Sequence, residues 1–256
     1  MQYLTIIIRL ARKFWFLRLI LQVHLFLKLE SLFRSRNENW KITTYYKKDD
    51  ENIFSQLCDL YGSDKGGSNT LTKPYPWPSH SYADYYWRIF ANSRSSIKKV
   101  LEVGIGTNNP ILASSMGIYG KPGASLRVWK EFFPNALIYG ADIDREILFK
   151  EDRIETGYMD QLDPESISVF LKNFGHEDFD LICDDGLHTF EAGSNLFINA
   201  IDNLCLGGIY IIEDVSVPDL YRYKEFFDRY SYIVEYVTLY RPGLDLQDNN
   251  LVVVRK

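Results

Sequence analysis

From about residue 98 onward, the chain alternates short apolar runs with longer amphipathic segments, and this alternation constrains the fold more than any other feature. Strands that alternate with helices favour a doubly wound α/β fold, in which helices cover both faces of a mostly parallel sheet. The turn between the last two short runs is too short for a helix, so these runs are expected to form an antiparallel pair at the sheet edge. The predicted strands are 98–104, 136–143, 179–185, 207–214, 232–240 and 250–256, and the predicted helices are 124–133, 164–173, 189–204 and 218–230.

The chain has 256 residues, which suits one large domain with additional segments. We expect a basic amphipathic helical arm at 1–50, a helical and loop segment at 51–95, and a Rossmann-like domain at 96–256. A stretch rich in Gly, Ser and Pro at 62–79 predicts an irregular loop. Aromatic side chains on and after this loop make it a candidate lid over a ligand: Tyr75, Trp77, Tyr82 and Tyr86.

Composition and charge exclude several classes of protein. With 46% hydrophobic and 25% charged residues, the chain is neither disordered nor a polytopic membrane protein. Residues 1–36 hold seven Lys or Arg and one Glu, a net +6, so the remainder carries −11. An acidic body of this kind argues against a nucleic-acid partner. The three cysteines show no paired spacing, which argues against a disulfide scaffold and fits a reducing, cytoplasmic setting.

The apolar arm at the start of the chain is too interrupted to cross a membrane. A spanning helix needs about 20 mostly apolar residues, whereas the longest uncharged stretch here, 19–27, has nine. No uninterrupted apolar core or small-residue cleavage site predicts a secretory signal. Residues 1–36 are therefore expected either to contact anionic lipids on the inner face of the membrane, or to pack on the domain or on a second copy of the chain in a homo-oligomer.

Glycine and acidic residues end the first two predicted strands. Gly104 and Gly106 follow Glu102, and glycines at such a turn let the backbone approach a ligand closely. No third glycine stands at dinucleotide spacing, because that position is Asn109, so nicotinamide binding is disfavoured. Asp142 ends the second strand, where an acidic residue can accept both hydroxyls of a ribose. A lone aspartate at that place can also cap the next segment.

The strongest local pattern is Asp184-Asp185-Gly186-Leu187-His188, at the end of an apolar strand, with Glu213-Asp214 ending the next. Strand ends converge on the ligand crevice of an open α/β sheet, so Glu102, Asp185 and Asp214 are expected close together. Clustered carboxylates repel one another unless a cation holds them, and oxygen ligands favour Mg²⁺. His188 is then placed to act as a general base. In the alternative, Asp185 and Asp214 cap helices and His188 is a surface residue.

Five segments together resemble the S-adenosylmethionine-dependent O-methyltransferases of the macrocin and mycinamicin type, which modify macrolide sugars and polysaccharides. These segments are LEVGIG, GASLRVWKEFFPNALIYGADID, MDQLD, DDGLH and GGIYIIED. Upstream, YGSDKG (61–66) and HSYADYY (80–86) are similar to segments of the same family, so the resemblance covers residues 55–256. It implies a class I methyltransferase fold of seven strands, in the order 3-2-1-4-5-7-6 with the last strand antiparallel.

The resemblance also implies roles for individual residues. Gly104 and Gly106 would line the methionine part of S-adenosylmethionine, and Asp142 would bind its ribose. Asp160 and Gln161 would flank the adenine, with Glu102 and Asp184 also at the cofactor. Mg²⁺ would be bound by Asp185, Asp214 and Glu102, next to His188 as the base and Asp185 as its catalytic partner. Two positions depart from the family pattern: Leu187 replaces the usual Ser, and Met159 the usual Gly.

The implied reaction is methyl transfer to a sugar hydroxyl of a glycan, a surface polysaccharide or a glycosylated metabolite. A metal that binds neighbouring hydroxyls can also bind phosphate oxygens, so a phosphoryl or phosphoramidate group of a polysaccharide precursor is an alternative acceptor. Two other classes stay open: a non-catalytic S-adenosylmethionine-binding protein, and a metal-dependent hydroxylase or hydrolase. The combination of Asp185, His188 and Asp214 disfavours the non-catalytic protein, because cofactor binding alone does not need them.

Overall fold

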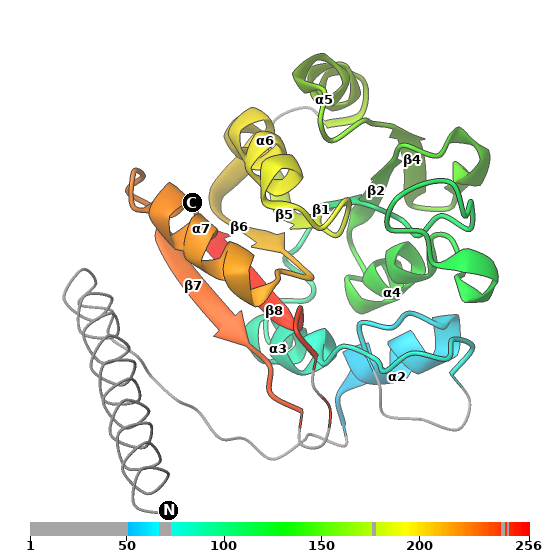
Figure 1. Ribbon diagram of the computed structural model, residues 1–256. Helices are drawn as coiled ribbons and strands as arrows, with labels where there is room; N and C mark the ends of the chain where they lie inside the picture. Colours follow the sequence, from blue (N-terminus) through cyan, green and yellow to red (C-terminus); the bar gives the residue numbers. More distant parts are fainter. Residues whose placement is uncertain (1–50, 67–72, 176–177, 242–243, 245) are drawn as a thin grey trace, which may run out of the picture. The chain divides into compact units, whose positions relative to one another are not determined.

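The computed structural model describes residues 51–256 except 67–72, 176–177, 242–243 and 245, and these residues belong to one compact unit (Figure 1). The predicted arm at 1–50 lies outside the described residues, so its helix and its contacts stay predictions. Among the helices that are described, none has the length and apolar character needed to cross a membrane.

The core of the unit is an eight-stranded sheet with the order β3-β4-β2-β1-β5-β6-β8-β7. β8 runs antiparallel to both of its neighbours, β3 runs antiparallel to β4, and the remaining pairs are parallel. The strands are β1 (Lys99–Val103), β2 (Leu137–Asp142), β3 (Lys150–Glu151), β4 (Ile154–Tyr158), β5 (Phe179–Asp184), β6 (Leu204–Ile212), β7 (Ile233–Thr238) and β8 (Asn250–Arg255).

The predicted topology is confirmed, with one addition. Without β3, the order corresponds strand for strand to 3-2-1-4-5-7-6, and β7 and β8 form the expected antiparallel pair at the edge. β3 is a two-residue eighth strand, exposed at the opposite edge. β4 was implied by the resemblance alone, because its sequence IETGY has no apolar run or clear alternation. β6 starts at Leu204, three residues before the predicted 207.

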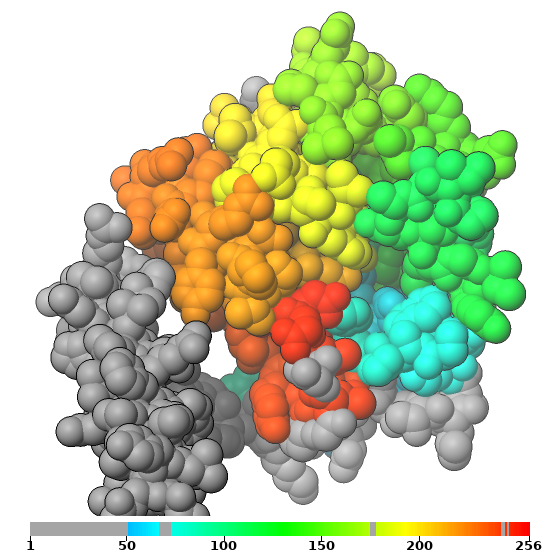
Figure 2. All heavy atoms as spheres, in the orientation of Figure 1, coloured from blue at the N-terminus to red at the C-terminus, as the bar shows by residue number. Residues whose placement is uncertain are grey.

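Helices cover both faces of the sheet (Figure 1). α2 (Ile53–Tyr61), α3 (Tyr82–Phe90) and α4 (Ala124–Phe132) pack on one face, and α5 (Pro164–Phe170), α6 (Phe190–Ala200) and α7 (Val217–Phe227) pack on the other. Side chains of α6 and α7, yellow and orange in Figure 2, close over the second face. A π-helical turn, Leu171–Gly175, extends α5, and 3₁₀ turns lie at Gly117–Tyr119, Arg145–Ile147 and Ile201–Asn203.

The helix starts follow from local side-chain chemistry. Asn52, Asp163, Thr189 and Ser216 precede α2, α5, α6 and α7, and each accepts a hydrogen bond from a backbone N–H of the first turn. α5 and α7 also carry a proline in the first turn, where its missing N–H costs nothing. These caps place the helices close to their predicted positions.

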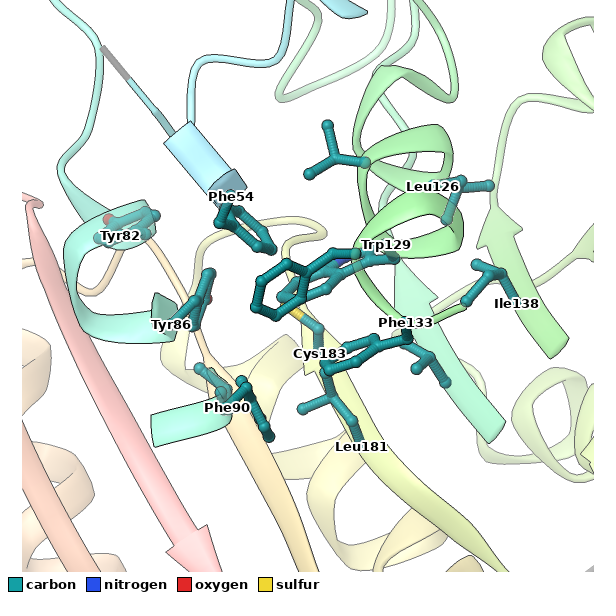
Figure 3. Packing of buried hydrophobic residues seen from close by; sticks show 14 of the residues in the cluster. Phe54, Tyr82, Tyr86, Phe90, Leu126, Trp129, Phe133, Ile138, Leu181 and Cys183 are labelled. Carbon is teal, nitrogen blue, oxygen red and sulfur yellow. The ribbon is translucent and has the colours of Figure 1, made fainter. Parts of the chain in front are cut away.

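An aromatic cluster joins α2 and α3 to α4 and the sheet (Figure 3). Phe54 of α2 contacts Trp129 of α4 at a ring distance of 4.7 Å, and Tyr86 of α3 lies 5.1 Å from the same indole. All three side chains are fully buried. Burying a large aromatic side chain contributes on the order of 2–3 kcal/mol, so this cluster fixes α2 and α3 firmly against the sheet.

Candidate active site

A cavity of about 180 Å³ opens at the carboxyl ends of the central strands. The segment after α2 lines it too, through residues 62–65. Most of the predicted site residues meet there, whereas Glu102 and Asp184 do not line it. The predicted residues that line the cavity are Gly104, Gly106, Asp142, Asp160, Gln161, Asp185, His188 and Asp214.

The glycine turn after β1 forms part of the cavity wall. Gly104 and Gly106 have φ angles of 87° and 86°, in the left-handed region that favours glycine. A Cβ at Gly104 would overlap the carbonyl of Asp185, and one at Gly106 would lie 2.7 Å from the sulfur of Met116. The turn therefore needs glycine both for its backbone conformation and because Asp185 and Met116 of the same chain approach it closely.

Asp142 ties this turn to the end of β2. Its Oδ2 accepts a hydrogen bond from the backbone N–H of Ile105 at 2.9 Å, and its Oδ1 accepts one from Asp144 at 2.9 Å. Burial raises the pKa of Asp142, and these hydrogen bonds oppose the shift. The capping role that was the alternative for Asp142 belongs to Asp144, which caps the turn at 145–147. Asp142 thus lies at the cavity with its carboxylate fixed.

Gln161 lines the cavity, and Asp184 lies behind it. Gln161 donates from Nε2 to Asp184 Oδ1 at 2.6 Å and accepts from the backbone N–H of Leu187 at 3.0 Å. Asp184 is 3% exposed, and its Oδ2 finds no hydrogen-bond partner among the described residues. Burial raises the pKa of Asp184 to about 6. Asp184 therefore holds Gln161 in place and does not reach the cavity itself.

Asp185, His188 and Asp214 form a compact group. Each offers one ligand atom, and these three atoms lie within 4.8 Å of one another. His188 Nε2 is 3.3 Å from Asp185 Oδ1 and 3.5 Å from Asp214 Oδ2. Two carboxylates and an imidazole suit a divalent cation such as Mg²⁺ or Mn²⁺, because these ions accept oxygen-rich donor sets. The residues present therefore fit a metal ion.

We call Asp185, His188 and Asp214 the metal group. Two of its members have an unusual backbone conformation. His188 and Asp214 have φ angles of 57° and 51°, although neither is glycine. Such left-handed residues cost of order 1 kcal/mol or more, and they gather at functional sites. Both residues line the cavity.

Opposite charges set the protonation of the metal group. Burial acts to raise the pKa of Asp185, but Lys65 and His188 outweigh it and hold the pKa below its usual value. Burial acts to lower the pKa of His188, but the hydrogen bond to Asp185 and the charge of Asp214 outweigh it and raise the pKa. The pKa of Asp214 is raised, mainly by burial. The group thus pairs a carboxylate with an imidazolium.

A buried lysine that the sequence patterns did not single out lies beneath the metal group. Lys65 Nζ lies 2.6 Å from Asp185 Oδ2 and 3.1 Å from Glu102 Oε1, and it also donates a hydrogen bond to Glu213. Residue Tyr86 donates to the other oxygen of Glu213. The available signal was the position of Lys65 in YGSDKG, a segment with family resemblance, but nothing in a lone Lys predicts burial.

Glu102 lies elsewhere than predicted. Glu102 is fully buried, and Trp129 donates to its Oε2 at 3.1 Å, so the geometry does not bring it into the metal group. The reason is that Glu102 lies within β1, whereas Asp185 and Asp214 follow the ends of their strands.

Tyr82 and Tyr86 are buried in the core and cannot close over the cavity as lid residues. Tyr82 instead donates to Asp214 Oδ1 at 2.6 Å from below.

The strand order, the helices on both faces and the glycine turn above an acidic crevice define a Rossmann-like class I methyltransferase fold. No protein-family model matches the chain. The chain is 36% identical over 160 residues to demethylmacrocin O-methyltransferase of Streptomyces fradiae, an alignment of 60% of this chain and 37% of that relative. It is 34% identical over 161 residues to mycinamicin VI 2''-O-methyltransferase of Micromonospora griseorubida, with shares of 60% and 37%.

A solved structure agrees with these relatives. The MycE methyltransferase of the mycinamycin biosynthetic pathway, in complex with Mg, SAH and mycinamycin VI, superposes with a TM-score of 0.57 at 25% identity. The superposition covers 79% of this chain and 54% of MycE. The chain therefore spans little more than a third of the length of the curated relatives and about half of MycE.

Proposed function

We propose that this protein is an S-adenosylmethionine-dependent O-methyltransferase that uses a divalent cation, with Mg²⁺ as the natural choice. The observation that carries the proposal is the metal group, two carboxylates with an imidazole beside them, whose nearest polar atoms lie within 4.8 Å of one another at the cavity that the glycine turn lines. The curated relatives support it, because their names describe O-methyl transfer. MycE supports the cofactor and the ion, because its complex contains SAH and Mg.

The cofactor is assigned to the side of the cavity formed by β1 and β2. Gly104 and Gly106 are assigned to the methionine part, because both line the cavity at the end of β1. Asp142 is assigned to the ribose hydroxyls, because its carboxylate is held at the cavity by two backbone donors. Asp160 and Gln161 follow Asp142 in the chain and also line the cavity, and they are assigned to the adenine.

The metal group is assigned to the reaction itself. Asp185 and Asp214 would hold the cation, which when bound supplies Lewis-acid activation of the acceptor oxygen. In the transfer, the methyl carbon leaves the sulfonium sulfur and bonds to the acceptor oxygen, whose proton goes to Nε2 of His188. His188 serves as this base only when Nε2 is unprotonated. The carboxylates that favour its protonated form are the same ones that we assign to the cation.

We propose a sugar hydroxyl of a glycosylated small molecule or glycan as the acceptor. Mycinamycin VI in the MycE complex supports a small-molecule acceptor. A phosphoryl or phosphoramidate oxygen of a polysaccharide precursor is the second candidate, because a divalent cation binds either kind of oxygen. A cytoplasmic location, membrane contact through residues 1–36 and a homo-oligomer stay predictions, since the arm lies outside the described residues.

Calorimetric titration of S-adenosylmethionine into the full chain, with Mg²⁺ and with EDTA, tests the proposal first. We expect micromolar binding in both conditions. Asp214→Asn should then weaken Mn²⁺ binding at least tenfold, and His188→Asn should lower methyl transfer to a sugar acceptor by about 10²–10⁴-fold. The matched control is Asp152→Asn, because the Asp152 side chain is 89% exposed. Absence of cofactor binding both with Mg²⁺ and with EDTA would overturn the proposal.

A further inference from the structure

The Lys65 ammonium lies in a cage of three carboxylates from three neighbouring strands. Glu102 belongs to β1, Asp185 follows β5, and Glu213 follows β6. The side chains of Lys65, Glu102 and Glu213 are at most 4% exposed. We call these three acidic residues the carboxylate cage. It is separate from the metal group except for Asp185, which belongs to both.

The backbone holds Lys65 rigidly in this place. The carbonyl of Lys65 accepts from the N–H of Ala83 at 2.9 Å, and the carbonyl of Asp64 accepts from His80 at 2.8 Å. Trp77 donates from its indole to the Asp64 side chain at 2.8 Å. These hydrogen bonds connect the loop to the start of α3, and Lys65 lines the cavity.

The negative charges in the cage favour a cation at its centre. The side chains of Glu102 and Glu213 are fully buried, and that of Asp185 is 23% exposed. As carboxylates they would repel one another and lose hydration, which the single hydrogen bonds from Trp129 and Tyr86 replace only in part. Lys65 is the cation that the described residues supply: it donates to Asp185 and Glu213 and pairs with Glu102. Glu102 Oε1 forms an ion pair with Lys65 but no aligned hydrogen bond with any described residue. Three carboxylates around one central charge are also the arrangement that a hard metal ion takes.

Asp185 connects the cage to the metal group. Its Oδ2 accepts from Lys65, which leaves Oδ1 facing His188 at 3.3 Å. Without Lys65, Asp185 would keep only its contact with His188.

We propose that Lys65 is a positioning residue that serves as a built-in cation: it fills the carboxylate cage, so that a single divalent ion binds, at the metal group, and it fixes Asp185 for that ion. This inference rests on the proposed function for the assignment of an ion to Asp185 and Asp214. It explains why the crevice binds one divalent ion, although it has enough carboxylates to bind two.

The test is the number of Mn²⁺ ions bound per chain, measured by electron paramagnetic resonance without cofactor or acceptor. The native chain should bind one ion, and Lys65→Ala should bind two, with a larger gain in melting temperature on addition of Mn²⁺. Lys65→Arg should keep one ion, because it restores a cation. The matched control Lys150→Ala should also keep one, since the Lys150 side chain is 73% exposed. Lys65→Ala that binds one ion with native affinity would overturn the inference.

A second variant covers the case in which Lys65→Ala does not fold. Lys65→Met combined with Glu102→Gln and Glu213→Gln removes the cation together with two of the negative charges. It should fold and bind one Mn²⁺ ion, because the one carboxylate left in the cage, Asp185, belongs to the metal group and forms no second site. Failure of this variant to fold, or binding of a second Mn²⁺ ion by it, would overturn the inference, because removing the opposite charges together should leave no need for a cation in the cage.

The same measurements separate the two proposals. A native chain that binds no Mn²⁺ contradicts the metal assignment of the proposed function, whatever Lys65 does. A native chain that binds one ion, while Lys65→Ala folds and also binds one, contradicts the inference about Lys65 alone.

Discussion

Asp184 and Asp185 are adjacent in the sequence but belong to different environments. Asp184 is the last residue of β5 and faces the buried layer with Gln161, whereas Asp185 lines the cavity. The sequence pattern treats both as part of one acidic motif at a strand end. The alternation of side chains along a strand separates them, and it leaves Asp184 with a carboxylate oxygen that lacks a partner among the described residues.

The burial of Asp184 predicts that its ionisation lowers the free energy of unfolding as the pH rises. Its pKa is raised to about 6 in the folded chain, so the protonated form is favoured on folding. The contribution of Asp184 to stability is therefore complete below its unfolded pKa of about 3.9 and is lost as the pH rises through about 6. In EDTA, Asp184→Asn should exceed the native chain in free energy of unfolding by about 1–3 kcal/mol at pH 7.5.

Urea denaturation at pH 7.5 and at pH 4 checks this expectation. The advantage of Asp184→Asn should nearly vanish at pH 4, where the native carboxyl is protonated. The exposed Asp152→Asn variant serves again as the control. Equal stabilities of Asp184→Asn and the native chain at pH 7.5 would contradict the prediction.

Site residues were predictable where the topology alone decides their position. Asp142, Asp185 and Asp214 end or follow parallel strands, and such ends meet at one edge of the sheet. Lys65 and Tyr82 reach the same place from 120 and 132 residues away in the sequence, by packing of their segment on the sheet. No local pattern encodes a contact of that kind, so these residues could not be assigned from the sequence.

At the scale of elements, α3 supports the metal group from beneath. Tyr82 donates to Asp214 Oδ1 at 2.6 Å and accepts from the Asp214 backbone N–H at 3.2 Å, so a single hydroxyl fixes the strained residue twice. His80, two residues before the start of the helix, stacks on Tyr82 with rings 4.9 Å apart, and its Nδ1 lies 3.4 Å from the same carboxylate. The first residue of α3 and the segment just before it thus orient a proposed metal ligand.

Removal of this hydroxyl should weaken metal binding and leave the cofactor alone. We expect Tyr82→Phe to reduce Mn²⁺ affinity about tenfold, the lower end of what partners behind a metal ligand contribute. Calorimetry with S-adenosylmethionine should give an unchanged affinity, because Tyr82 does not line the cavity. The control is Tyr85→Phe on the same helix, whose hydroxyl donates to Glu235. Equal Mn²⁺ affinities of the two variants would contradict the assignment.

At the scale of the whole molecule, the fold buries an unusual number of phenols. Tyr82, Tyr86, Tyr210 and Tyr223 are each at most 2% exposed, and burial raises the pKa of all four. Burial also raises the pKa of Tyr75 and of Tyr236 to about 12. A raised pKa of a phenol favours folding below the unfolded value near 10 and loses that contribution as the pH rises further.

Alkaline titration should therefore proceed in two steps. The exposed tyrosines among the 18 in the chain should ionise near pH 10, and the buried ones only when the fold is lost at higher pH. Absorbance at 295 nm follows the ionisation, and far-UV circular dichroism follows the fold. In guanidinium chloride a single step near pH 10 is expected. A single step near pH 10 in the native chain, with the dichroism unchanged, would contradict the burial of these side chains.

The left-handed backbone of His188 and Asp214 decides which substitutions at the site are informative. A β-branched replacement such as valine would disturb the turn whatever the side chain does, so a loss of activity would say nothing about proton transfer or metal binding. Asparagine adopts the left-handed conformation more readily than other residues with a side chain. Loss of activity in His188→Asn or Asp214→Asn can therefore be attributed to the missing imidazole or carboxylate, whereas the same loss in a valine variant cannot.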